Sequence, residues 1–555
     1  MHVLSFLDVF DIINASQVNS SLHRFIQCSN VLQYHIRLQL ACAQDNPNSI
    51  LPISERLSLL KTHEEAWSHL TFDFLRVIPV ELQTSHISRL TGGIYLFGDK
   101  NRRALHYINL PSKRSDTVEW NKIEIDKELI GVGLNILEHD LIAVLTSAPS
   151  LTEAQSYILE VQLLQLSTAK PHPQALTHVL FVAESSSTEY PSTALEVVGV
   201  NIVLIAIHSG SSSQPHDYLR VFDWMSGEMK LEQQIDLQKC MYHPSLVFLT
   251  AELLLIPNAR DLALDIWEIP SSGSEDTHPL VPIVSLALPS ISHVHRVSRF
   301  FCHAEPNPTA PLPARSPPPS SVGPDPASGS MQLGLATAYA KKPFHPCPED
   351  AVVVINMHLQ TASHVLIAKK GLFVRRVDLL EAVRRASAGD FVGHKDKEEG
   401  EGSGQAGGQD ETVGAGGEAG PGHPIVRFSL WGSHIARCLS YMRRRSPWTT
   451  TSAGTRCLFE QSHDVWRVFD FNPVAVRRAR AELAQRREGD QPYFRQLGSK
   501  ARSTAGLDYV SIIVDPHGAV AAAGIEWDFY NMMTDEERVI GVKVGVSSLA
   551  PFACD

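Results

Sequence analysis

The sequence contains no apolar run long enough to cross a membrane. Its longest apolar stretches, such as NIVLIAIH at 201–208 and AELLLIP at 251–257, fall well short of the roughly 20 residues that a membrane helix needs. The opening residues also lack the basic segment and the small-residue cleavage site of a secretory signal. These absences predict an intracellular protein, in the cytoplasm, the nucleus or both, with no membrane partner.

Basic charge and regularly spaced cysteine are scarce as well. The 48 Lys and Arg residues are outnumbered by 60 Asp and Glu residues, which gives a formal net charge of −12. A nucleic-acid binder presents a basic surface to phosphate groups, so this balance argues against one. None of the eight cysteines forms a CxxC pair or a Cys/His series. We therefore expect reduced thiols rather than disulfides or a zinc site.

Motifs of catalysis are absent too. There is no GxxxxGK[ST] phosphate loop, no HExxH zinc helix and no GxSxG nucleophile elbow. His358, His364 and His434 lie in or beside strand-like runs, where a structural histidine is more common than a ligand. We predict a protein that is not an enzyme and has no metal or other cofactor.

Two tracts cannot build a core. Residues 303–330 are packed with proline, and residues 393–422 are rich in Gly and Glu with few apolar side chains. Such segments bury too little surface to offset the entropy of ordering them, so both are predicted to be disordered insertions. In the first tract, Pro308–Pro311 matches a PxxP ligand and Ser316 precedes a proline as phosphorylation sites do. A tolerated loop insertion is the favoured interpretation of both tracts.

Helical and strand-like patterns occupy different parts of the chain. Up to about residue 76 the apolar residues return at helical spacing, as in two series: Leu32, Ile36, Leu40 and Leu57, Leu60, Trp67, Leu70. Beyond about Pro79, short runs of β-branched and aromatic residues alternate with Gly, Pro, Ser and Asn, which is typical of strands. Two further helices are predicted, at 375–387 and 475–488.

The second of these helices is basic. It carries Arg477, Arg478 and Arg480, and it follows another arginine cluster at Arg443–Arg445. Both clusters could bind an acidic or phosphorylated partner. A solvated basic face is the favoured interpretation.

A faint repeat runs through the strand-like region. The segments LRVFDWMSG (219–227), LDIWEIPSSG (264–273) and WRVFDFNP (466–473) share an alternation of apolar residues, an aromatic residue, an acid and then a turn. Weaker copies lie around Ile108 and Leu164. Units of roughly 40 to 60 residues with several strands are typical of β-propeller blades. The pattern predicts a degenerate WD-type β-propeller, although it lacks the Gly-His pair of such repeats. A pair of β-sandwiches is the alternative.

A series of apolar and acidic residues in the first forty positions carries a family resemblance. The series consists of Val3-Leu4, Leu7-Asp8, Asp11-Ile12, Val18, Leu22, Phe25-Ile26, Ser29 and Leu32. It resembles the F-box, a helical module that attaches substrate receptors to the Skp-type adaptor of a cullin ubiquitin ligase. The following residues, up to about 76, resemble the linker helices of fungal F-box proteins.

The match departs from the family in three places. The Leu-Pro head of the motif is missing, Asn19 replaces the usual Cys, and Leu22 replaces the usual Trp. We expect either that the start codon was assigned too far downstream or that part of the adaptor contact has been lost.

The resemblance implies a multidomain α+β protein. Its parts would be an F-box over 1–40, linker helices over 41–78 and an all-β domain over 79–555. The helices would bind the Skp-type adaptor, and through it a cullin, with the side chains of Val3, Leu4, Leu7, Asp8, Phe10, Ile12, Val18, Leu22, Phe25, Ile26 and Leu32. The linker would be stiffened by Leu57, Leu60 and Trp67.

The implied function is that of a non-catalytic substrate receptor in ubiquitin-dependent degradation, with the β domain binding a target protein. The runner-up is a propeller-type interaction scaffold with no ligase role. A propeller enzyme is a third possibility, and it would require acids or metal ligands clustered at the central channel.

Overall fold

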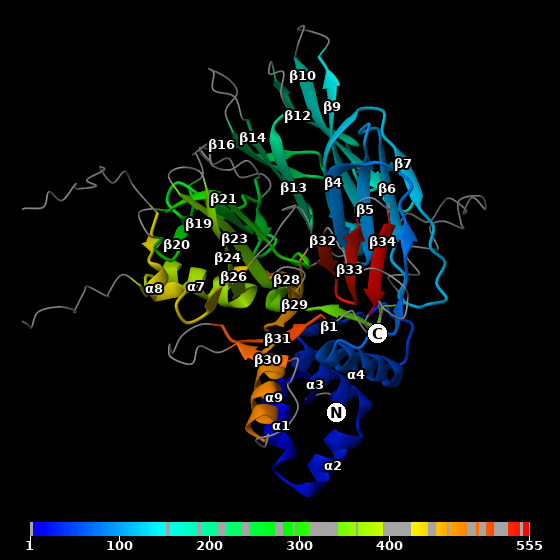
Figure 1. Ribbon diagram of the computed structural model, residues 1–555, viewed down its shortest axis with the longest axis vertical. Coiled ribbons are helices and arrows are strands. Elements are labelled where there is room, and N and C mark those ends of the chain that lie inside the picture. The colour runs from blue at the N-terminus through cyan, green and yellow to red at the C-terminus, as the bar shows by residue number, and fades with distance from the viewer. Residues whose placement is uncertain are drawn as a thin grey trace, which may run out of the picture.

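The computed structural model describes residues 4–150, 156–185, 190–208, 217–235, 244–271, 281–291, 295–310, 342–361, 365–391, 423–441, 451–462, 465–485, 495–498, 507–514, 531–543 and 548–553. The chain is mostly β, with a group of helices at one end (Figure 1). Among the helices in these ranges, none is long and apolar enough to span a membrane.

The N-terminal helices begin at capping side chains. They are η1 (Leu4–Phe6), α1 (Val9–Ser16), α2 (Ser20–Cys28), α3 (Asn30–Ala41) and α4 (Ile53–His69). Asp8 caps α1, Asn19 caps α2 and Ser29 caps α3, each by accepting a backbone N–H near the start of the helix. The helices predicted for the first 76 residues are therefore confirmed. Asn19, which stands where the family has Cys, serves as a helix cap.

Seven sheets follow one another along the described residues. The first contains β4 (Thr84–Thr91), β5 (Ile94–Asp99), β6 (Ala104–Asn109) and β7 (Asn121–Glu124). The second contains β8 (Glu128–Asn135), β9 (Leu141–Pro149) and β10 (Tyr157–Gln165), with β11 (Lys170–Pro171) and β12 (Val179–Ser185) both paired to β10; the short helix α5 (Ile136–His139) joins β8 to β9. The third contains β13 (Ser192–Val198), β14 (Asn201–Ile207), β15 (Tyr218–Asp223) and β16 (Met229–Gln234).

The remaining sheets carry additions. The fourth contains β17 (Val247–Phe248), β18 (Leu253–Asn258), β19 (Ala263–Glu268) and β20 (Val284–Ala287), and β25 (Ile425–Val426) pairs in parallel with β20. The fifth contains β21 (His295–His303), β23 (Val352–Thr361), β24 (Leu366–Arg375) and β26 (Ala436–Tyr441). The sixth contains β27 (Ser452–Ala453), β28 (Arg456–Ser462), β29 (Val465–Asp470), β31 (Tyr509–Ile513) and β30 (Arg495–Gly498).

The seventh sheet joins the two ends of the β domain. Its strands β32 (Asn531–Thr534), β33 (Arg538–Lys543) and β34 (Ser548–Ala553) come from the C-terminal part, whereas β2 (Phe74–Leu75) and β3 (Ile78–Pro79) follow α4 and pair with β34. Outside the seven sheets, β1 (Ala43–Asp45) pairs with β22 (Phe344–Pro346). The other helices are η2 (Pro348–Asp350), α7 (Arg376–Ser387), α8 (Phe428–Trp431) and α9 (Pro473–Ala484). The helices α7 and α9 confirm the two that were predicted within the β region.

The sheets form a closed ring (Figure 1). A buried apolar cluster joins each sheet to the next one along the chain. A further cluster joins the seventh sheet to the first, through contacts of Met533 and Ile540 with Leu90 and Phe97. The β domain is therefore propeller-like, as the sequence predicted, and the sheets do not pair into two sandwiches.

Packing on both sides explains why some strands are apolar throughout. In β14, Ile202 and Leu204 face the cluster shared with the second sheet, whereas Val203 and Ile205 face the cluster shared with the fourth. All seven residues of β14 are buried. A strand with a sheet on each face has no polar side, so the run NIVLIAI is continuous rather than alternating.

The repeated segments occupy equivalent places. They lie in β6, β10, β15, β19 and β29, each of which is the third strand of its sheet. The acid at the end of the segment holds the turn that follows: Asp223 Oδ1 accepts the N–H of Met225 at 3.0 Å, and Asp470 Oδ1 accepts that of Asn472 at 2.9 Å. The repeat therefore reflects a shared strand-to-turn geometry.

The predicted disorder is wrong at the start of the proline-rich tract. Residues 304–310 pack along the axis of the ring, where Arg376 Nη1 donates to the carbonyl of Pro306 at 2.9 Å. The N–H of Ala310 donates to Glu138 Oε1 at 2.8 Å. Polar partners from other elements thus fix a segment that its composition alone would leave loose. The rest of that tract, with Pro311 and Ser316, and all of 393–422 lie outside the described residues.

Candidate partner-binding surface and its junction with the sheets

The first three helices form a module with a small core of its own. Val9, Ile12, Ile26, Leu32 and Ile36 are buried in it. Three of these, Ile12, Ile26 and Leu32, belong to the predicted adaptor-binding set. Because they are at most 2% exposed, they support the surface from inside and can touch a partner only if the module opens.

The other predicted residues lie closer to solvent. Leu4, Leu7 and Leu22 are half-buried and pack against the module core. Asp8 is exposed and caps α1, because its Oδ1 accepts the N–H of Asp11 at 2.9 Å. Val3 lies outside the described residues.

Among the described residues of the module, six large apolar side chains are exposed; Val31 is 37% exposed and the other five are more so. These five are 40% to 80% exposed, and they are Phe6, Phe10, Ile13, Val18 and Phe25. We call them the apolar surface. So many exposed large apolar side chains on so short a segment make the module a candidate interaction site.

Sequence reasoning selected three of these five residues and missed Phe6 and Ile13. The signal that could have found Ile13 is its spacing from Phe10. Phe10 and Ile13, three positions apart, share one side of α1, whereas Phe6 lies in the separate helix η1.

The basic helix α9 borders this surface and lies beside α1 (Figure 1). The Arg477 guanidinium carbon lies 5.6 Å from the centre of the Phe10 ring, close enough for a cation–π contact. On the same helix, Arg480 forms an ion pair with Asp508. The helix is thus partly engaged within the chain rather than wholly solvated. The cluster Arg443–Arg445 lies outside the described residues.

The linker helix α4 bridges the module and the ring. Near its start, Leu57 and Leu60 are buried against Tyr34 and Leu38 of α3. Near its end, Trp67 is buried in the cluster shared by the sixth and seventh sheets. The three residues predicted to stiffen the linker are therefore all buried, and one helix is anchored to both bodies.

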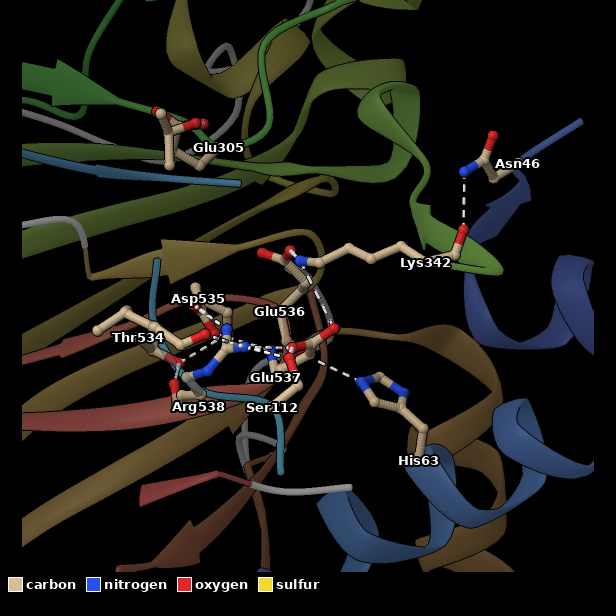
Figure 2. A network of polar contacts seen from close by, with 12 residues as sticks. Asn46, His63, Ser112, Glu305, Lys342, Thr534, Asp535, Glu536, Glu537 and Arg538 are labelled. Carbon is tan, nitrogen blue, oxygen red and sulfur yellow. Dashed lines mark hydrogen bonds and ion pairs between the residues drawn. The ribbon is translucent and has the colours of Figure 1, made fainter. Parts of the chain in front are cut away.

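Polar contacts fix the second anchor. His63 Nε2 lies 2.9 Å from the carbonyl oxygen of Glu536 (Figure 2). Trp67 Nε1 donates to the same oxygen at 3.0 Å. Glu536 belongs to the turn between β32 and β33. The helix is thereby held against the backbone of the seventh sheet.

The same turn contains a buried ion cluster (Figure 2). Arg538 is 1% exposed and pairs with Asp535 at 2.7 Å and with Glu537 at 2.6 Å. Ser112 Oγ, from the first sheet's loop, donates to Glu537 at 2.8 Å, and Lys342 pairs with Glu536. Burial alone would raise the pKa of the Glu537 carboxyl, but Lys342 and Arg538 hold it well below its usual value. The cluster joins the two sheets where the ring closes.

A second ion pair ties α4 to the sixth sheet. Arg456 Nη2 donates to both carboxylate oxygens of Glu64, at 2.9 and 3.1 Å, and Arg456 Nε donates to Asp470 at 3.3 Å. The guanidinium also lies 5.0 Å above the Trp67 ring. Burial would raise the pKa of Glu64, but Arg456, with His63 adding to it, lowers the value to about 2.

Comparisons with known proteins add little to this description. No protein-family model matches the chain, and no curated protein does. Among the solved structures that overlap part of it is Hsv2 of Kluyvelomyces marxianus (12% identity, 38% of this chain and 71% of that one, TM-score 0.19). Others are a luciferin-regenerating enzyme (8% identity, 54% of this chain and 88% of that one, TM-score 0.24) and Hsv2p of Kluyveromyces lactis (9%, 38% and 83%, TM-score 0.17). Such low TM-scores carry no argument about function, so the arrangement of the seven sheets alone defines the β domain as propeller-like.

Proposed function

We propose that the chain is the substrate-recognition subunit of a Skp–cullin–F-box ubiquitin ligase. The observation that carries the proposal is the apolar surface on a module with a separate core. A Phe or Val side chain gains about 1.5–3 kcal/mol when it is fully buried, so Phe6, Phe10, Val18 and Phe25 offer a partner a substantial driving force. The F-box resemblance of the same segment supplies the identity of that partner, a Skp-type adaptor.

The junction suits such a receptor. A receptor acts by proximity, since it raises the effective concentration of a target lysine near the charged ubiquitin-conjugating enzyme. That effect is largest when the adaptor-binding end and the target-binding end keep a fixed relation. The contacts of α4 with Glu536 and Arg456 limit bending between the two ends.

The target would bind the propeller-like domain, whose repeats we interpret as degenerate WD-type units. No step of this function requires a residue of the chain to transfer a proton or to form a covalent bond. The runner-up, an interaction scaffold without a ligase role, would use the same β domain and would not need the apolar surface.

Co-purification with a Skp-type adaptor tests the proposal. We expect the native chain to retain the adaptor and a Phe10→Asp/Val18→Asp variant to lose it, because a charge in the interface would have to be desolvated. A matched control is Phe181→Asp, since Phe181 is 61% exposed on β12 of the second sheet, far along the chain from the module. This variant should retain the adaptor.

Two outcomes would contradict the proposal, provided that all variants are folded. Circular dichroism and thermal melting should be unchanged in all variants, which excludes loss of fold as the cause of lost binding. Equal retention by the native chain and the Phe10→Asp/Val18→Asp variant would refute the apolar surface as the adaptor site. No retention by a folded native chain would favour the scaffold.

A further inference from the structure

A cavity of about 220 Å³ lies on the axis of the ring. Residues of β4, β8, β13, β21, β27 and β32 line it, together with residues just before β17, so six sheets contribute a strand and the fourth contributes the segment that leads into it. Its wall is more apolar than polar, with Leu90, Leu134, Leu137, Val197 and Phe301 among the lining residues, and it also contains Arg89 and several acids. Concave, mostly apolar sites with a few polar groups are the usual form of small-molecule sites.

The segment after β21 crosses this cavity and carries Glu305. The carbonyl of Glu305 accepts the N–H of Gly454 at 2.8 Å. Two residues later, Asn307 Nδ2 donates to Glu196 Oε2 at 3.3 Å. These contacts, with those of Pro306 and Ala310 given above, fix the segment on both sides of Glu305. The Glu305 carboxyl group is therefore held in place in the cavity rather than carried on a loose loop.

Glu305 differs from the other acids of the cavity wall. Glu196 forms an ion pair with Arg89 at 3.4 Å, Asp535 pairs with Arg538 and Glu536 pairs with Lys342. Glu138 has no ion pair in the described residues, but it accepts hydrogen bonds from Asn135 Nδ2 at 2.7 Å and from the N–H of Ala310 at 2.8 Å. Within the described residues, Glu305 has no ion pair and accepts one side-chain hydrogen bond, from Thr91 Oγ1 at 3.4 Å. Figure 2 shows it set apart from the cluster around Arg538.

The surroundings of Glu305 disfavour the charged form of its carboxyl group. Burial raises the pKa of Glu305 to about 8, and the Glu196 carboxylate adds to the effect, against Arg89 and Arg376. A carboxyl group in this state gains most from a cation that enters beside it. Ser452, which lines the cavity and is 0% exposed, offers a second polar group, because its hydroxyl has no hydrogen-bond partner in the described part of the chain.

We propose that the axial cavity binds a small hydrophobic amine, with Glu305 as the counter-ion of its ammonium group. The apolar wall would hold the hydrocarbon part. A cavity of about 150 Å³ accepts benzene, so the larger volume here admits an aromatic ring with a short amine arm. A metal ion fits less well, since no three His, Cys, Asp or Glu side chains of the described residues are grouped to hold one.

Calorimetric titration of the full chain with phenethylamine tests the inference, with phenethyl alcohol as the neutral isostere. We expect the amine to bind at least tenfold more tightly than the alcohol at pH 8. Only ionised Glu305 pairs with the ammonium, and the ionised fraction grows tenfold per pH unit below a pKa of about 8. The affinity should therefore rise about tenfold from pH 6 to pH 7 and level off above pH 8. Buffers of different ionisation enthalpy should reveal proton release at pH 7.

Matched variants complete the test. Glu305→Gln should bind amine and alcohol equally and without pH dependence, whereas Glu305→Asp should keep the preference in weakened form. Glu228→Gln removes one charge from an exposed turn and should behave as the native chain. Equal affinity of the native chain for amine and alcohol, undiminished amine binding by folded Glu305→Gln, or no amine binding at all would overturn the inference. None of these outcomes bears on adaptor binding.

Discussion

The ring of sheets and the helical module hide their apolar side chains to different degrees. In the ring, Val203 and Leu204 point to opposite faces of β14 and are both 0% exposed, because a neighbouring sheet covers each face. In the module, Ile12 is 0% exposed, whereas Phe10, two positions earlier, is 55% exposed. The ring completes its own core. The module leaves several of its large apolar side chains exposed.

The largest expected effect comes from a charge in the ring core. Leu204→Asp would place a carboxylate between the second and third sheets with no partner, a change that exceeds the usual range of single substitutions. We expect the chain to lose its cooperative urea transition, followed by intrinsic tryptophan fluorescence. Glu196→Asp, which keeps a charge already paired with Arg89 of the first sheet, is the control. A native-like transition of Leu204→Asp would mean that the two sheets are not closely packed.

The next effect is expected where the two regions meet. Arg456→Met would leave Glu64 and Asp470 without their shared cation. Removing one partner of a buried pair costs about 3–5 kcal/mol, and we expect the lower end because the Glu64 side chain is 28% exposed. Thermal unfolding should reveal the loss, and adding Glu64→Gln should recover part of it.

Lys61→Met is the matched control for Arg456→Met, since Lys61 lies on α4 and is exposed. It should leave the unfolding transition in place. A loss below about 1 kcal/mol for Arg456→Met, within the range of surface pairs, would show that the ion pair does not fix the module on the ring.

Local sequence patterns predicted much of the fold, because the spacing of apolar residues decides which side of a strand or helix is buried. The alternation of apolar residues in LRVFDWMSG and LDIWEIPSSG identified β15 and β19, the third strands of their sheets. Helical spacing identified Leu57, Leu60 and Trp67 as residues on the buried side of α4. The F-box resemblance pointed to the segment that carries the apolar surface. It could not divide that segment into core and surface, because both Ile12 and Phe10 are simply apolar in the sequence.

The remaining features depend on partners far away in the chain. Ring closure uses the two-residue strand β3, which pairs with β34 some 470 positions later. No local pattern marks so short a strand. The segment 304–310 has the composition of a disordered tract, yet Glu138 and Arg376 hold its backbone. Glu305 gained its unusual environment in the same way, from side chains of other sheets.

A smaller effect at the junction should appear with pH. The folded-state pKa of Glu64, about 2, lies below its ordinary value of 4.5. Its contribution to stability is therefore fully present above about pH 4.5 and is lost as the pH falls through about 2. The difference in thermal midpoint between the native chain and Glu64→Gln should shrink over that interval. Glu65→Gln, on the exposed side of the same helix, should show no such trend. A constant difference would rule out Glu64 as the group responsible.

The smallest effect on stability is expected on the apolar surface itself. Val18 is 72% exposed, so Val18→Ser should change the free energy of unfolding by no more than about 0.5 kcal/mol. Ile12 is 0% exposed and packs with Ile26 and Leu32 in the module core. Ile12→Ser should therefore cost several times as much, because it opens a cavity and buries a hydroxyl group. Urea titration of both variants measures the contrast. Similar losses for the two would mean that Val18 is covered within the chain, and the module would then have no apolar side to offer a partner.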